Sequence, residues 1–251
     1  RNIWKNKVFS AINIIGLAIG IAACITIMVF VFYEKSFDSM HKKNIYRLNE
    51  VQKFEGMVEP QNVALSMYPM ATTLKQEFPE IKNYTRVREN EKVNMRLGDK
   101  RIILPAVFYV DSTFLEIFDF PLIKGNRETA LQKPNSLLLT EESATKLFGK
   151  EDPMGKTVVK YGEDTIPFTI TGILKNVPAN SHLQFDGLYS FSTIYNPQMM
   201  ENWGANWLTT YLELDKNAII SAMEKKFPAY LKSHMEGEGW KHYELFLQPL
   251  K

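Results

Sequence analysis

The hydrophobic residues of this chain are concentrated in one uninterrupted run close to its beginning. Residues 11–33 (AINIIGLAIGIAACITIMVFVFY) are 23 consecutive residues without a charge. At a rise of about 1.5 Å per residue they form a helix of about 35 Å, enough to cross a hydrocarbon core of about 30 Å. Asn13 and Thr26 are its clearly polar side chains. The pattern therefore predicts a helix that spans a membrane.

A secretory signal and a core helix of a soluble protein are the two other structures that such a run suggests. A signal has an apolar core of about 7–15 residues and then a small-x-small cleavage site. This run is longer and ends in the bulky residues 30–33 (FVFY), which favours a retained span. A core helix would have a polar face, and this run has none.

Beyond residue 33 the pattern changes to short segments that alternate between strand-like and helix-like spacing. Strands are predicted at 45–53, 84–88, 92–97, 101–110, 120–123, 136–140, 157–161, 166–174, 207–214 and 243–250. Helices are predicted at 66–78, 114–118, 141–148 and 218–232. Gly98 and Asp99 predict a hairpin between two of the strands. Thr113, followed by Glu116, is typical of a capping box.

The predicted fold class is α+β: one N-terminal transmembrane helix, then a mixed α/β extracytoplasmic domain with two subdomains. Short links and the lack of continuous Val/Ile strands argue against a doubly wound parallel sheet. The predicted division is a cytoplasmic flank at 1–10, the transmembrane helix at 11–33 and the exported domain at 34–251.

The distribution of charge predicts the orientation in the membrane. Residues 1–10 carry Arg1, Lys5 and Lys7 and no acid, so the positive-inside rule places this end in the cytoplasm. Residues 34–251 hold 27 Lys and Arg against 28 Asp and Glu. The domain is therefore close to neutral, and no basic stripe with interleaved aromatic residues indicates a nucleic-acid partner.

The residues that could carry catalytic or metal chemistry show no suitable spacing. The single cysteine, Cys24, lies inside the predicted span, so the exported domain has neither a disulfide nor a thiol nucleophile. The four histidines lack metal-ligand spacing and are interpreted as solvated or core residues. Residues 149–157 (GKEDPMGKT) differ from a phosphate-binding loop, because five residues separate the glycines and a helix precedes the loop. We expect no catalytic residue, cofactor or metal.

Two features of the span and the domain indicate packing. Gly16 and Gly20 form a GxxxG pattern, which lets a neighbouring membrane helix approach closely. The aromatic residues of the segment 108–120 are interpreted as core rather than as a ligand site.

The order of motifs along the whole chain resembles the first membrane helix and periplasmic core domain of MacB/FtsX-type ABC-transporter permeases. The segments that carry the resemblance are NIWKNK at 2–7, INIIGLAIG at 12–20, SFD at 36–38, NIYRL at 44–48, VDSTFLEIFDFPL at 110–122, PNSLLLTE at 134–141, ITGIL at 170–174 and PANSH at 178–182. The chain is most similar to the stand-alone members, which have no fused ATPase.

The resemblance implies a bacterial inner-membrane permease subunit that does not itself hydrolyse ATP. It implies a separate cytoplasmic ABC ATPase, a permease dimer, a periplasmic or outer-membrane partner, and a substrate such as a peptide, a lipoprotein, an antibiotic or a cell-wall hydrolase. Family permeases carry further spans after the domain, so the chain is expected to be a fragment. In this interpretation Gly16 and Gly20 pack the span, and Phe37 with Asp38 couples it to the domain.

Two other functions share this layout of one span and one exported α+β domain. The first is the sensory domain of a signalling receptor. The second is a membrane-anchored enzyme, which requires a convergent polar cluster in a deep pocket.

Overall fold

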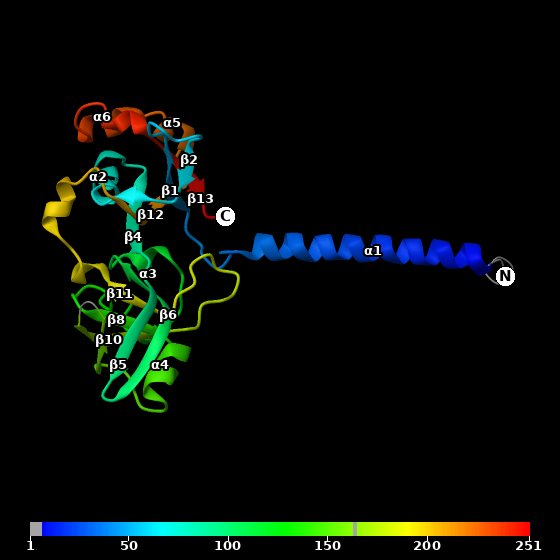
Figure 1. The fold of residues 1–251 in the computed structure, drawn as a ribbon, viewed down its shortest axis with the longest axis horizontal. Helices are drawn as coiled ribbons and strands as arrows, with labels where there is room; N and C mark the ends of the chain where they lie inside the picture. Colours follow the sequence, from blue (N-terminus) through cyan, green and yellow to red (C-terminus); the bar gives the residue numbers. More distant parts are fainter. Residues whose placement is uncertain (1–6, 163–164) are drawn as a thin grey trace. The chain divides into compact units, whose positions relative to one another are not determined.

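The computed structural model describes residues 7–162 and 165–251. Most of the predicted basic flank, including Arg1 and Lys5, lies outside the described residues. The first element, α1 (Lys7–Ser36), contains the predicted span and extends three residues beyond it. Among the described residues, α1 is the one helix long and apolar enough to cross a membrane (Figure 1). Its apolar side chains are exposed. The structure thus has the N-terminal apolar helix that the sequence predicts.

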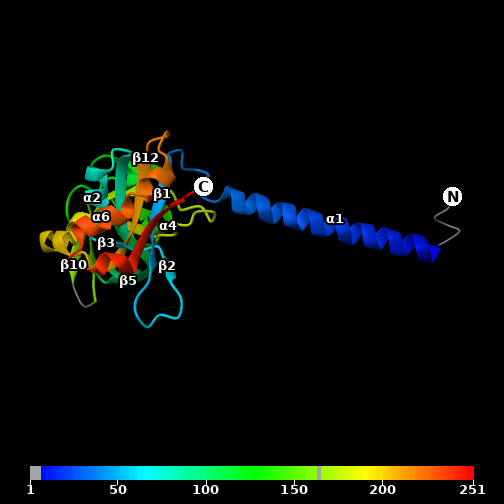
Figure 2. The same cartoon turned by 90° about the horizontal axis from the view of Figure 1, so that it is seen from above.

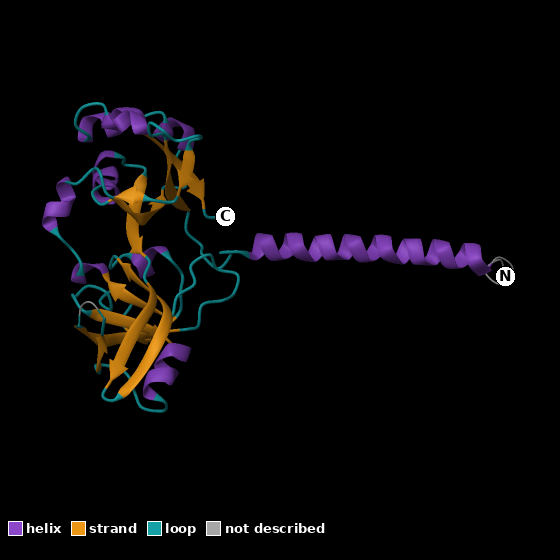
Figure 3. Ribbon diagram, in the orientation of Figure 1, coloured by secondary structure: helices purple, strands orange, loops and turns teal. Residues whose placement is uncertain are grey.

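The chain divides into two compact units. The first contains residues 1–40 together with residues 180–182 and Lys251. The second contains residues 41–179 and 183–250 and carries all the strands that the described residues form. This second unit is a mixed α/β domain, as predicted (Figure 3).

Six strands of the second unit close into a barrel. In ring order they are β5 (Glu91–Leu97), β6 (Lys100–Val110), β11 (Gly187–Ser190), β8 (Ser136–Thr140), β10 (Ile166–Leu174) and β9 (Thr157–Lys160). The pairs β6–β11 and β8–β10 are parallel, and the other four are antiparallel. Buried Tyr109, Phe168 and Tyr189 fill the interior. The edge strand β7 (Leu122–Gly125) adds to β10, and α4 (Glu141–Phe148) packs beside β8.

The remaining strands form an open antiparallel sheet covered by helices. Its order is β4 (Ile81–Arg88), β12 (Asn206–Leu214), β1 (Ile45–Gln52) and β13 (Tyr243–Pro249), with β2 (Gln61–Val63) on β1 and β3 (Ser66–Met67) on β12. The covering elements are α2 (Met70–Glu77), α5 (Ile220–Glu224) and α6 (Phe227–His234). A second core, which includes Leu48, Leu212 and Phe227, lies between sheet and helices. A long loop at residues 53–60 joins β1 to β2 (Figure 2).

A buried ion pair lies where the sheet meets the barrel. There β4 pairs with β6 through Val87 and Val110. The guanidinium of Arg86 donates to Asp111 at 2.8 and 3.0 Å and lies 4.3 Å from the ring centre of Phe191. Burial alone would lower the pKa of Arg86, but the hydrogen bond and charge of Asp111 raise it. The Arg86 guanidinium is therefore charged, and both side chains have hydrogen-bond partners.

Most predicted elements are present, and three predictions are wrong in detail. The expected capping box does not form, because Thr113 donates its hydroxyl to Tyr84 O and its backbone is helical; the short helix is α3 (Phe114–Ile117). The expected helix at 66–78 begins only at Met70, since Ser66 and Met67 pair with β12. The expected helix at 218–232 is divided into α5 and α6, with Pro228 in the first turn of α6.

Candidate coupling site at the end of the apolar helix

The predicted coupling residues, Phe37 and Asp38, lie immediately after the last residue of α1. Phe37 is half-buried, and its ring meets that of Tyr33 edge to face at 5.3 Å. Asp38 adopts a left-handed backbone conformation with φ of 53°. Aspartate tolerates this region better than most residues, so the chain can turn sharply as the helix ends.

The end of α1 is held by three residues from the loop between β10 and β11. We call these three residues (Asn180, Ser181 and His182), together with Ser36 and Asp38, the clamp. The Asp38 carboxylate accepts from Ser181 Oγ at 3.2 Å and from the His182 backbone N–H at 3.1 Å, and it contacts His182 Nδ1 at 2.8 Å. Asp38 N donates to Asn180 O at 2.9 Å. Asn180 Nδ2 donates to Ser36 O at 2.9 Å, satisfying a carbonyl that a helix end leaves without an intrahelical partner.

The electrostatics of the clamp favour a charged carboxylate. Asp38 is only 4% exposed. Burial acts to raise the pKa of Asp38, but the hydrogen bond and charge of His182 outweigh it, together with the Ser181 hydroxyl, so the pKa lies below its ordinary value of 3.8. A buried carboxylate held by charge-assisted hydrogen bonds contributes more than a neutral contact does. At neutral pH the Asp38 carboxylate is therefore charged, and it holds residues 181 and 182 to the end of α1.

The clamp connects the helix to the barrel strands through the chain itself. Residues 180–182 are continuous on one side with β10 and on the other with β11. The sequence indicates Asp38 by its position and by the resemblance, whereas it favours a solvated or core interpretation of His182. The contact between Asp38 and His182 is therefore not predicted from the sequence. The segment PANSH at 178–182 was the available signal.

The two glycines of the GxxxG pattern face open space within this chain. A Cβ added at Gly16 or Gly20 would meet no atom within 4 Å. Residues four apart share one face of a helix, so the two glycines form a shallow surface on α1. Their role in packing against a second membrane helix stays a prediction.

The other residues considered for chemistry have structural partners. The loop at 149–157 follows α4 and leads into β9, and its Lys156 pairs with Glu151. His41 accepts from the Asp119 backbone N–H between the rings of Phe118 and Phe120. Within residues 7–162 and 165–251, no group of three or more His, Cys, Asp or Glu side chains has an arrangement that could hold a metal ion.

An apolar helix joined to a two-core α/β domain is the arrangement typical of a membrane-anchored protein with a large domain outside the bilayer. The family model of the MacB-like periplasmic core domain matches residues 10–230. The chain therefore belongs to this family, whose members are components of ABC transporters, as the resemblance in the sequence predicted.

Solved structures show the same fold. A domain assigned to a permease of Porphyromonas gingivalis matches with a TM-score of 0.72 at 23% identity, over 85% of this chain and 91% of the other. The periplasmic region of MacB from Actinobacillus actinomycetemcomitans matches with a TM-score of 0.58 at 16% identity, over 84% and 91%. The extracellular domain of the transporter YknZ from Gram-positive bacteria matches with a TM-score of 0.56 at 16% identity, over 81% and 100%. The search of curated proteins found no match.

Proposed function

We propose that this chain belongs to a permease subunit of a MacB/FtsX-type ABC transporter. In this function α1 spans the bacterial inner membrane with its basic end in the cytoplasm, and residues 34–251 lie in the periplasm. A separate cytoplasmic subunit hydrolyses ATP, and the permease converts this into movement of the periplasmic domain. The movement serves export or extraction of a peptide, a lipoprotein or an antibiotic.

The observation that carries the proposal is the family match from residue 10 to residue 230, which includes most of the helix and most of the domain. The clamp supports it, because Asp38 and residues 180–182 form a joint at the point where a moving helix would act on the barrel strands. Family membership also favours a transporter component over a sensory domain or an anchored enzyme.

The coupling role can be tested in membranes that contain the complete gene product. We expect ATP to change amide hydrogen exchange at residues 36–40 and 180–182 of the wild type. Asp38→Asn keeps a residue that tolerates the left-handed backbone but removes the charge. This variant should retain ATP hydrolysis by the associated subunit and lose the change in exchange. Ser39→Ala, whose side chain is exposed, is the matched control. If no ATPase subunit co-purifies and ATP leaves the exchange unchanged, the proposal is wrong.

The packing role of the glycines has an internal reporter. Cys24 lies four residues after Gly20 and therefore on the same face of α1. If α1 packs against a second copy through this face, oxidation should join two protomers through Cys24. Gly16→Ile with Gly20→Ile should abolish the product, whereas Ala18→Ile, on another face, should not. Equal cross-linking in all variants would exclude this packing.

A further inference from the structure

The chain passes from the barrel to the open sheet through the connection at residues 191–205, which joins β11 to β12. Near the end of this connection the main-chain hydrogen bonds are local. Asn202 N donates to Met199 O at 3.1 Å, and Gly204 N donates to Asn202 Oδ1 at 2.9 Å. These bonds shape the turn but do not attach it to the helices that cover the sheet. The side chain between them, Trp203, makes that attachment.

Trp203 packs against the last turn of α6. Its ring lies flat on the imidazole of His234, with the ring centres 4.5 Å apart and the planes 15° apart, and it meets Tyr230 edge to face at 5.8 Å. Tyr230 and His234 are four residues apart and therefore share one face of the helix. His234 is the last residue of α6. The connection thus rests on the imidazole at the helix end.

The imidazole also has an acidic partner from a second helix. His234 Nε2 contacts Glu77 Oε1, and Glu77 is the last residue of α2. The hydroxyls of Tyr230 and Thr73 join the same two helices at 2.5 Å. Burial raises the pKa of Tyr230, so its hydroxyl stays neutral. The carboxylate of Glu77 therefore supplies the charge against the imidazole.

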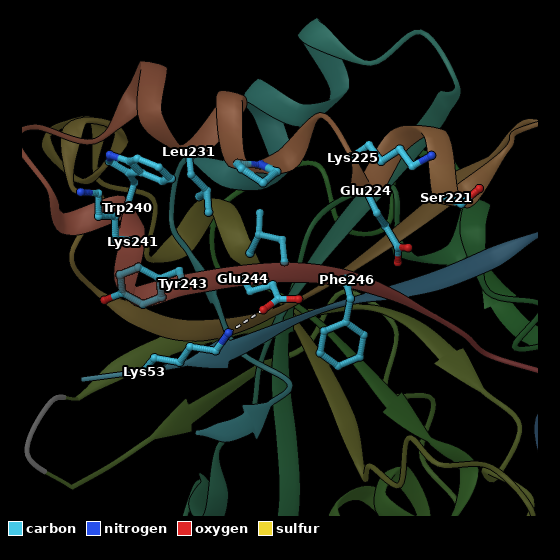
Figure 4. A pocket seen from close by; sticks show the side chains of 12 residues that line it. Lys53, Ser221, Glu224, Lys225, Leu231, Trp240, Lys241, Tyr243, Glu244 and Phe246 are labelled. Atoms are coloured by element: carbon cyan, nitrogen blue, oxygen red, sulfur yellow. Dashed lines mark hydrogen bonds and ion pairs between the residues drawn. The ribbon is translucent and has the colours of Figure 1, made fainter. Parts of the chain in front are cut away.

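The lysines in the last turns of α2 and α6 are engaged elsewhere. Lys75 donates to a backbone carbonyl of β4 at 2.7 Å. Lys232 lies 5.9 Å from the ring centre of Trp240. Trp240 lines a groove of about 590 Å³ beside β13, which is bordered by another face of α6 (Figure 4). Among the described contacts of His234, Glu77 is therefore the charged partner.

Protonation of the imidazole strengthens each of these contacts. An imidazolium forms a charge-assisted hydrogen bond with a carboxylate, attracts the face of an indole and is favoured at the C-terminal end of a helix. The neutral ring keeps the stack but loses this attraction. The docked state of Trp203 therefore binds the proton more tightly than the undocked state, so docking weakens as the pH rises. Histidine is the side chain that changes charge between about pH 5 and pH 8.

We propose that His234 is a proton-sensitive latch. When it is protonated it holds residues 202–205 to α2 and α6, and when it is neutral it loosens them. Mildly acidic surroundings thus fasten the connection between the barrel and the sheet, and alkaline surroundings release it. The latch is separate from the clamp, so it depends neither on the coupling role nor on the identity of a partner.

The test measures backbone amide hydrogen exchange of residues 202–205 in the full chain in lipid nanodiscs, at about pH 6 and about pH 8. Each rate is divided by the intrinsic rate at the same pH, so that only opening of the structure is compared. We expect the amides of Asn202 and Gly204 to be about fivefold better protected at the lower pH. This is the combined effect of one partly exposed ion pair and one cation–π contact.

Three variants locate the proton. His234→Gln cannot take it up and should show equal protection at both pH values. Glu77→Gln leaves the ring stack in place and should reduce the pH difference to about twofold. His242→Gln is the matched control: His242 also stacks on an aromatic ring, that of Phe54 at 5.3 Å, but its Nδ1 contacts Lys53 O rather than a carboxylate. This control should keep the full pH difference.

Titration of Glu50 is the competing explanation, because the pKa of Glu50 is raised from 4.5 to about 7 and its ionisation affects the whole domain. Glu50→Gln should therefore keep the pH difference at Gly204. Equal protection at both pH values in the wild type, or a pH difference that survives His234→Gln, would overturn the proposal. Loss of the difference in Glu50→Gln or in His242→Gln would also overturn it, since the proton would then act elsewhere.

Discussion

The buried carboxyl of Glu50 should make the periplasmic domain less stable as the pH rises. Glu50 lies on β1 between Leu245 of β13 and Val63 of β2, and its relative exposure is 0%. Its Oε2 accepts from Gln52 Nε2 at 3.1 Å, while its Oε1 has no hydrogen-bond partner among the described residues. Burial raises the pKa of Glu50 from 4.5 to about 7, and the Gln52 hydrogen bond offsets only part of this.

The sign of the effect follows from proton binding. Between pH 4.5 and about 7 the folded state holds a proton on Glu50 that the unfolded state has released. The free energy of unfolding therefore falls as the pH rises through this range, and it levels off above the folded-state pKa. The shift corresponds to about 3 kcal/mol at full ionisation, since each unit of pKa is about 1.4 kcal/mol. This is a large part of the stability of a typical domain.

Glu50→Gln removes the titration at nearly constant shape. We expect the free energy of unfolding of the wild type to fall by up to about 3 kcal/mol between about pH 5 and pH 8, relative to the variant. Urea denaturation of the full chain in detergent micelles measures it. Tryptophan fluorescence reports on the domain, because three of the four tryptophans lie between residues 203 and 240.

The dependence of the free energy of unfolding on pH, compared between the wild type and Glu50→Gln, separates the effect of titration from any packing defect that the glutamine causes. A packing defect lowers the stability of the variant equally at every pH, whereas titration changes only the slope. Glu244→Gln, at an exposed position on β13, should keep the wild-type slope. Parallel curves for the wild type and Glu50→Gln would refute the reasoning.

Three further predictions concern the clamp, the ion pair and one close backbone approach. Asp38→Asn should lower the local stability of the clamp by about 2 kcal/mol, since a hydrogen bond to a charged group is lost, and amide exchange at residues 36–40 should increase. Arg86→Met should lower the free energy of unfolding by at least about 3 kcal/mol in urea denaturation, because it leaves Asp111 buried and unpaired. Gly125→Ala should lower the melting temperature more than Gly56→Ala does: both backbones are left-handed, but only at Gly125 would the new Cβ lie 2.5 Å from a backbone oxygen.

Local pattern and turn chemistry predicted most elements of the domain. The run of 23 charge-free residues became α1, and Gly98 with Asp99 became the β5–β6 hairpin. Gly149, with φ of 64°, ends α4 directly after the predicted helix at 141–148. Such features depend on residues close in sequence, which is why a single sequence reveals them.

The closure of the barrel could not be predicted from the sequence. It depends on two parallel pairings, β6 with β11 and β8 with β10, between segments far apart in the chain. β11 has only four residues, GLYS at 187–190, and this pattern differs little from that of a loop. Gly172 and Gly187 carry information about close approach, because a Cβ at either would meet a backbone oxygen at 2.9 or 2.7 Å. A glycine in a strand does not by itself indicate which strand it approaches.

The two buried carboxyls, Asp38 and Glu50, show why sequence gave only part of the candidate site. Both are acids beside polar residues, yet the three-dimensional partners shift their pKa values in opposite directions: His182 holds Asp38 charged, and burial without sufficient partners favours the neutral form of Glu50. The contribution of Asp38 is therefore present above its ordinary pKa of 3.8 and is lost as the pH falls below it, whereas Glu50 destabilises the domain as the pH rises from 4.5 to about 7. At acid pH the clamp should therefore open, while Glu50 is protonated and does not destabilise the domain. At basic pH the clamp should stay closed, while the charged Glu50 lowers the stability of the domain. Because the pH ranges in which Asp38 and Glu50 titrate do not overlap, measurements over a series of pH values can separate loss of coupling at the helix end from loss of the fold.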